Sequence, residues 1–156
     1  MRRVCAALAL AGLALAGCGS QLPKGVDKTK LDQYVSDAIG DPNTCVLIGR
    51  QGSGEIVWRY NTHTTCGRTL PACDQPGART VGDLLKAVAK DGRPRTLSCD
   101  SSPDGSRGVG WAGGPIAGHK FVYAAVMEGQ RALPGRIMAE KLEGALQDAG
   151  FKSAPK

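Results

Sequence analysis

The strand-forming segments of this sequence follow one another in pairs joined by short, glycine-containing turns, and this order restricts the fold more than any other feature. Two pairs are visible, at 45–48 with 56–60 and at 109–116 with 121–127, and 95–100 is a fifth candidate strand. Two strands joined by a short turn lie antiparallel, whereas parallel strands need a long crossover connection. The order therefore predicts an antiparallel sheet.

Three further segments carry apolar residues at the three- and four-residue spacing of an amphipathic helix. Thr29, Thr80 and Pro134 are the expected starts, and Gly40, Gly92 and Gly150 the expected stops. Thr80 and Asp83 match a variant capping box in which Asp replaces the usual Glu or Gln. The expected fold class is α+β. It is a single small domain over 27–151, with a five-stranded antiparallel sheet and three helices in the order α-β-β-α-β-β-β-α.

The first 17 residues have the composition of a targeting sequence. Arg2 and Arg3 precede an uncharged Ala/Leu-rich run from 4 to 16, which is too short to cross a bilayer and suits a signal peptide. The run ends in Leu15-Ala16-Gly17-Cys18, which resembles the lipobox of bacterial lipoproteins at all four positions. The resemblance implies a signal peptide at 1–17, acylation of Cys18, and a lipidated tether at 18–26. Two or three acyl chains anchor a protein durably where one does not.

The resemblance also gives a location. It places the chain on the periplasmic face of a membrane, and Gly19 after the acylated cysteine favours the outer membrane if the host is Gram-negative. Ordinary cleavage after Ala16 is the alternative, and it would release a soluble protein. In either case the domain lies in an oxidising compartment, and residues 152–156 form a short tail.

Cysteine content in such a compartment predicts disulfide bonds. Cys5 leaves with the signal peptide and Cys18 carries lipid, so an even number remains in the domain: Cys45, Cys66, Cys73 and Cys99. Four cysteines allow three pairings. We favour Cys66–Cys73, which closes a polar loop, with Cys45–Cys99, which joins two strands.

A metal site competes with the disulfides at the same residues. His63, Cys66 and Cys73 are three ligands of suitable type, but their spacing matches no zinc knuckle. A thiol-redox role has no C-x-x-C motif to support it. We therefore expect no metal and no cofactor.

Two stretches resemble serine β-lactamases and penicillin-recognising enzymes. Residues 45–61, CVLIGRQGSGEIVWRYN, resemble the first hairpin of that family, and 108–149 resemble its last two strands and closing helix, especially those of class D. The family's catalytic motifs are missing, because 70–76 read LPACDQP in place of S-x-x-K and no K-[ST]-G occurs near 97–100. The resemblance therefore implies a reduced, non-catalytic domain. The element order also resembles roadblock-like and profilin-like sandwiches and small heme- or ligand-associated domains, which are binding or assembly folds.

Candidate binding residues are the aromatic and basic side chains of two strands, Trp58, Arg59, Tyr60 and Trp111, because Trp, Tyr and Arg are enriched at binding hot spots. Alternation along a strand also allows one of these faces to be core. No catalytic residue is assigned: the Ser98 region has the composition of a loop, and His63 has no visible partner. His119 is expected at a solvated hairpin tip.

Charge and composition restrict the partners. Without Arg2 and Arg3 the chain has four more basic than acidic residues, and these are scattered, so nucleic acid is not an expected partner. The expected function is a membrane-anchored envelope lipoprotein with a non-enzymatic binding or assembly domain, whose partner is an envelope protein or peptidoglycan. The alternatives are a reduced penicillin-recognising hydrolase using a serine near Ser98, and a small-ligand or heme-binding domain.

Overall fold

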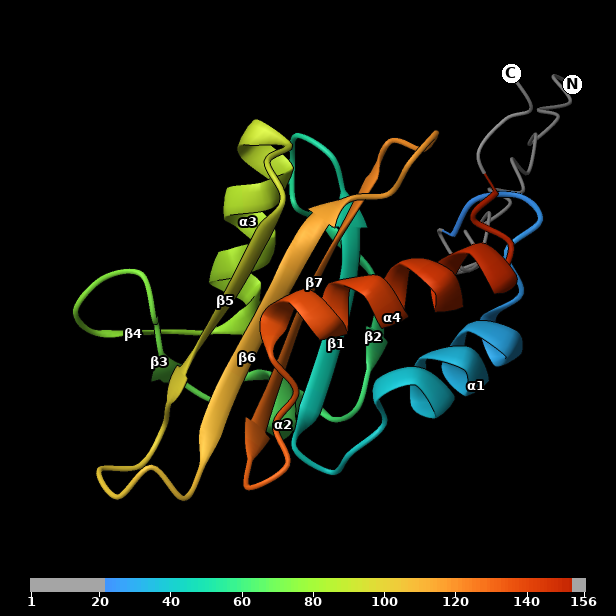
Figure 1. Ribbon diagram of the computed structural model, residues 1–156. Coiled ribbons are helices and arrows are strands. Elements are labelled where there is room, and N and C mark those ends of the chain that lie inside the picture. Colours follow the sequence, from blue (N-terminus) through green and yellow to red (C-terminus); the bar gives the residue numbers. More distant parts are fainter. Residues whose placement is uncertain (1–21, 153–156) are drawn as a thin grey trace, which may run out of the picture.

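A computed structural model describes residues 22–152 (Figure 1). The elements in chain order are α1 Lys28–Ile39, β1 Thr44–Arg50, β2 Ile56–Tyr60, α2 His63–Cys66, β3 Leu70–Pro71, β4 Ala78–Arg79, α3 Val81–Asp91, β5 Arg95–Asp100, β6 Gly108–Pro115, β7 Phe121–Gly129 and α4 Gly135–Asp148. The predicted fold class and order of major elements are confirmed. The one-turn helix α2 and the short β3–β4 pair are additions within a segment that reads as a loop.

Some predictions fall outside this part of the chain. The signal peptide, the lipobox, acylated Cys18, the start of the tether and the end of the tail lie beyond residues 22–152. Within 22–152, no helix has both the length and the apolar character needed to cross a bilayer.

The five long strands form one antiparallel sheet in the order β2-β1-β7-β6-β5. β1 and β7 lie inside the sheet and are buried almost throughout. Burial on both faces explains why these segments read as continuous apolar runs and not as alternating ones. β2 and β5 form the two edges.

Helices cover both faces of the sheet, so the core has two layers (Figure 1). α1 and α4 pack on one face, where Leu31, Ile48 and Leu142 are among the buried residues. α3 packs on the other face with Leu47 and Val126, and Leu70 from the segment 61–79 completes this second layer.

The helix ends are partly as predicted. The Thr80–Asp83 capping box is present, with both reciprocal hydrogen bonds, and Gly92 ends α3 in the left-handed conformation with φ 67°. The expected Thr29 cap is wrong: the N-cap of α1 lies two residues earlier, where the carboxylate of Asp27 accepts from the backbone N–H of Lys30. Asp and Thr are both good N-caps, so the sequence alone does not separate them.

Two disulfide bonds are present, as predicted, but the favoured pairing is wrong. The bonds are Cys45–Cys66 and Cys73–Cys99, with Cα–Cα distances of 5.2 and 5.5 Å. Cys45 and Cys99 cannot pair because β7 and β6 lie between their strands. Three strand spacings come to roughly 14 Å, about twice the Cα separation that a disulfide allows.

The same bonds explain how the segment 61–79 is held. It crosses the α3 face of the sheet from the β1 side, where α2 contacts β1, to the β5 side. One disulfide fixes each side of the crossing, so Cys66 and Cys73 are held apart. Between them, Trp111 Nε1 donates to the Pro71 carbonyl at 2.9 Å.

Candidate functional site: a pocket beside α4

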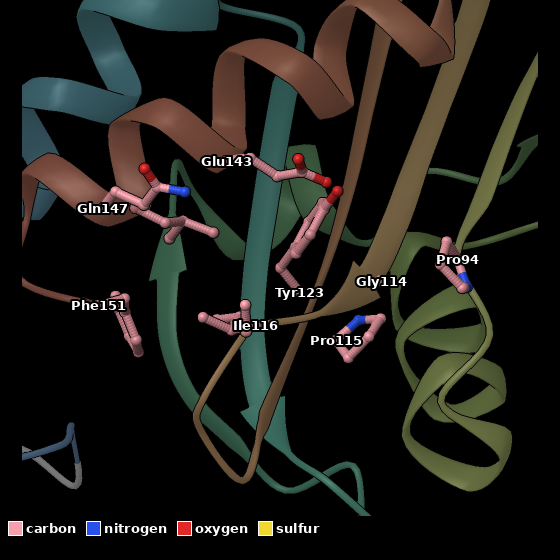
Figure 2. Close-up of a pocket in the computed structure, with 10 residues that line it drawn as sticks. Pro94, Gly114, Pro115, Ile116, Tyr123, Glu143, Gln147 and Phe151 are labelled. Carbon is pink, nitrogen blue, oxygen red and sulfur yellow. The ribbon is translucent and has the colours of Figure 1, made fainter. Parts of the chain in front are cut away.

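A cavity of about 260 Å³ lies between the second half of α4, the end of the β6–β7 hairpin and the start of β5 (Figure 2). Its inner surface is apolar and buried, and consists of Gly114, Ile116, Tyr123, Leu146 and Phe151. Its rim is exposed, and consists of Pro94, Pro115, Ala117, Glu143 and Gln147. Apolar walls with a few polar groups are typical of small-molecule sites.

Glycines determine where α4 contacts the sheet and where a gap remains. Gly114 lies directly opposite Tyr123 in the β6–β7 register, and a Cβ on Gly114 would come within 3.6 Å of the Tyr123 ring and 3.7 Å of Pro94. At the other end of β6, a Cβ on Gly110 would overlap the Leu133 carbonyl, and a Cβ on Gly135 would overlap the Trp111 carbonyl. The start of α4 is therefore pressed against β5 and β6.

From that contact α4 crosses the sheet toward α1 (Figure 1), and its second half leaves the β5 side of the face. The first turn of α4 is held by Ser98 of β5, whose Oγ accepts from the Gly135 N–H at 2.9 Å. Pro134 provides no side-chain cap. The sheet surface near Pro94 and Gly114 is thus left without a helix above it, and the pocket forms there.

Tyr123 is the unusual residue of the pocket. Its side chain is 2% exposed. Its hydroxyl makes no hydrogen bond with any residue between 22 and 152. Burial raises the Tyr123 pKa, and the negative charge of Glu143 raises it further, so the phenol keeps its proton. It can donate one hydrogen bond and accept another.

Other buried aromatic residues differ from Tyr123 in this respect. Trp58 Nε1 donates to Asp32 at 2.9 Å, and the Trp111 N–H has the Pro71 carbonyl as its partner. Polar atoms on buried aromatic rings are normally paired in this way. The Tyr123 hydroxyl opens onto the pocket instead, so it is available to pair with a ligand.

Phe151 closes the pocket on the side away from β5. Its ring meets His119 edge-on at a centroid distance of 5.3 Å and Phe121 at 6.3 Å. His119 Nε2 lies 3.1 Å from the Lys152 carbonyl oxygen. His119 was expected at a solvated tip; it is instead half-buried, because the chain after α4 folds back over the β6–β7 turn.

The predicted binding residues do not form one exposed aromatic surface. Trp58 lies in the core layer under α1 and α4, and Trp111 lies in the layer under α3, so they are on opposite faces of the sheet. Tyr60 donates to Ser36, and the guanidinium of Arg59 lies against His63. Both tryptophans are core residues, which is the alternative that alternation along the strands left open.

The three residues of the competing metal-site interpretation, His63, Cys66 and Cys73, do not form a ligand set. Cys66 and Cys73 are bonded to Cys45 and Cys99, so neither sulfur is available as a thiolate. Across residues 22–152, no three His, Cys, Asp or Glu side chains are grouped closely enough to hold a metal ion.

A second polar cluster surrounds Glu128 at the opposite end of β7. Its carboxylate, 4% exposed, accepts from Arg107 at 2.8 and 2.9 Å, from Arg68 at 2.8 Å and from Ser101 at 2.9 Å. These bonds, led by Arg107, lower the Glu128 pKa to about 2, although burial opposes the shift. The cluster joins the segment 61–79 to the β5–β6 hairpin, and its hydrogen bonds are satisfied. It therefore reads as a structural network.

No protein-family model, curated protein or solved structure matches this chain in comparisons with known proteins. None of the described residues that line the pocket is a serine, cysteine, lysine or histidine. The polar groups that the pocket offers are the Tyr123 hydroxyl, the Glu143 carboxylate and the Gln147 carboxamide.

Proposed function

We propose that this protein is a lipid-anchored envelope protein whose domain binds a small molecule, or a small apolar group of a larger envelope component, without converting it. The anchor is acylated Cys18, and the location is the periplasmic face of a membrane, the outer membrane in a Gram-negative host. The observation that carries the binding role is the hydroxyl of Tyr123, the polar end of a ring that is otherwise buried, which opens onto an apolar cavity and has no hydrogen-bond partner among residues 22–152.

The physical reason is that a ligand in the pocket can pair with that hydroxyl away from bulk water. Such a hydrogen bond contributes about 0.5–1.5 kcal/mol net. A ligand that also covers the apolar walls gains about 25 cal/mol for each Å² removed from water. Both contributions arise only when the pocket is filled.

The experiment is a thermal-denaturation screen of small phenyl compounds, carried out on the chain and on Gly114→Val. Valine suits a strand, and its side chain would extend from a position in ordinary contact with Tyr123 into the cavity. We expect compounds that raise Tm of the native chain to lose their effect on the variant. Equal shifts in both proteins, or none in either, would contradict binding at this pocket.

The anchor has a separate test. Cys18→Ala should leave the folded domain unchanged but release the protein from the membrane fraction and abolish incorporation of radiolabelled palmitate. Undiminished membrane association of this variant would refute the lipoprotein assignment.

The alternatives have less support. Ser98 is engaged in holding the first turn of α4, so we expect no covalent labelling by a fluorescent penicillin. A labelled band that disappears in Ser98→Ala would reverse that view. For heme, the described lining includes no His, Met or Cys, and the pKa of Tyr123, the one residue there of a type that ligates heme iron, is raised, which disfavours the phenolate that would bind.

A further inference from the structure

The charge at the rim of the pocket indicates which ligands it selects. Of the four glutamates in the chain, three form ion pairs: Glu55 with Arg50, Glu128 with Arg68 and Arg107, and Glu140 with Arg136. Glu143 has no ion-pair partner among residues 22–152. It is also the only acidic or basic side chain among the described residues lining the pocket.

Glu143 and Tyr123 present their oxygens to the same space. Figure 2 shows the carboxylate of Glu143 reaching from α4 toward the phenol of Tyr123 on β7, and the two groups interact electrostatically. They are not hydrogen-bonded to each other. A ligand group with several N–H donors, such as an ammonium, could therefore donate to both oxygens at once. A ligand carboxylate has no such donors and would be repelled by Glu143.

Three further features fit a cation. The pocket is walled by the aromatic rings of Tyr123 and Phe151, and a ring face attracts a nearby ammonium group. Gln147 at the rim adds a carboxamide oxygen that can accept from it. No arginine or lysine lines the described wall to repel a positive charge.

The size of the cavity sets the apolar part of the ligand. A cavity of about 150 Å³ holds a benzene ring, so about 260 Å³ accommodates one ring or a short branched alkyl group with a two- or three-atom arm. From charge, geometry and volume together, we infer that the pocket beside α4 binds an organic ammonium: a primary amine carried on a single small apolar or aromatic group. This inference rests on the proposed binding function and specifies its ligand class.

The test uses three probes that share a phenyl ring and differ in the end group: 2-phenylethylammonium, 2-phenylethanol and 3-phenylpropionate. Binding is measured at pH 7 from backbone amide NMR shifts at Gly114, Leu146 and Gln147. We expect the amine to bind about three- to tenfold more tightly than the alcohol. This modest ratio is what an ion pair or charged hydrogen bond with a solvent-exposed carboxylate contributes. The acid should bind more weakly than either.

Variants identify the groups responsible. Glu143→Gln should reduce the amine's affinity to that of the alcohol and leave the alcohol unchanged. Glu140→Gln, a matched change one turn earlier on α4, should leave both affinities as they were. Added salt should weaken the amine alone.

The outcomes separate the two proposals. Binding of the alcohol or the acid as tightly as the amine, or an amine preference that survives in Glu143→Gln, overturns the ammonium inference and leaves the pocket a binding site. If none of the three probes shifts the pocket residues, the proposed binding function falls together with the inference.

Discussion

Replacing Glu128 with glutamine should remove a pH-dependent part of the stability of this domain. The carboxylate lies almost fully buried at the end of β7 and receives four hydrogen bonds, two from Arg107 and one each from Arg68 and Ser101. Glutamine has nearly the same shape but no charge. The variant therefore tests the charge of this network and not its packing.

The magnitude follows from the Glu128 pKa, which falls from 4.5 to about 2 on folding. A shift of this size corresponds to about 3 kcal/mol of stability at neutral pH. We expect about 2–3 kcal/mol, because Arg68 and Arg107 are partly exposed and water screens their charges. The sign follows from proton binding: between pH 4.5 and 2 the unfolded chain binds the proton more readily, so stability is full above pH 4.5 and falls as the pH is lowered toward 2.

The assay is urea unfolding of the native chain and Glu128→Gln at pH 7, 5, 4 and 3. The difference in unfolding free energy should be about 2–3 kcal/mol at pH 7 and should shrink to less than half of that by pH 3. Glu140→Gln, which breaks an exposed pair with Arg136, should cost less than about 1 kcal/mol throughout. A difference at Glu128 that stays constant with pH would show that packing, not charge, is lost.

Three other expectations test the fold. Non-reducing peptide mapping should find Cys45 joined to Cys66 and Cys73 joined to Cys99, and a peptide joining Cys66 to Cys73 would contradict the structure. In urea unfolding, the free energy of unfolding of a Cys73→Ser, Cys99→Ser double variant should be lower by about 2–4 kcal/mol. Gly110→Ala should cost about 1–3 kcal/mol because its Cβ overlaps a carbonyl, whereas alanine at Gly144, which faces open space in α4, should be stabilising. Thr80→Ala should cost about 1 kcal/mol through loss of the α3 capping box, and an unchanged Tm would refute that role.

Much of the fold could be predicted because local signals decide it. Hairpin spacing fixed which strands are antiparallel neighbours along the chain, and Thr80 with Asp83 and Gly92 marked the two ends of α3. These features depend on residues a few positions apart. The class of fold and the order of elements therefore follow from sequence pattern alone.

Features that depend on the sheet order could not be predicted in the same way. The pairing of Cys45 is settled by the two strands that separate β1 from β5, and hairpin signals do not place β7 next to β1. The roles of Trp58 and Trp111 were undecided for a similar reason. Alternation shows that a residue points to one face, but not whether that face is covered by a helix or a loop.

The pocket had a weak signal in the sequence: glycines at 110, 113 and 114 in a strand, where a missing side chain often marks a close approach or a gap. What the sequence could not show is that Gly114 stands opposite Tyr123 and that α4 leaves both uncovered. Glu143 reads as an ordinary surface residue of an amphipathic helix. Its significance comes only from the phenol and the cavity on its inner side.

An unpaired polar atom is informative only when a ligand can reach it, and the structure offers the comparison. Within residues 22–152, the Thr44 hydroxyl and Arg79 Nε also lack partners, but both are enclosed completely by protein atoms and can only be a packing cost. The Tyr123 hydroxyl opens onto a cavity, so a ligand there can pair with it. Tyr123→Phe should therefore leave the empty protein as stable as before or more stable, while weakening the binding of any hydrogen-bonding ligand. Effects of opposite sign on stability and affinity are what a binding residue gives; a phenol needed only for packing would lower the stability and leave the affinity unchanged.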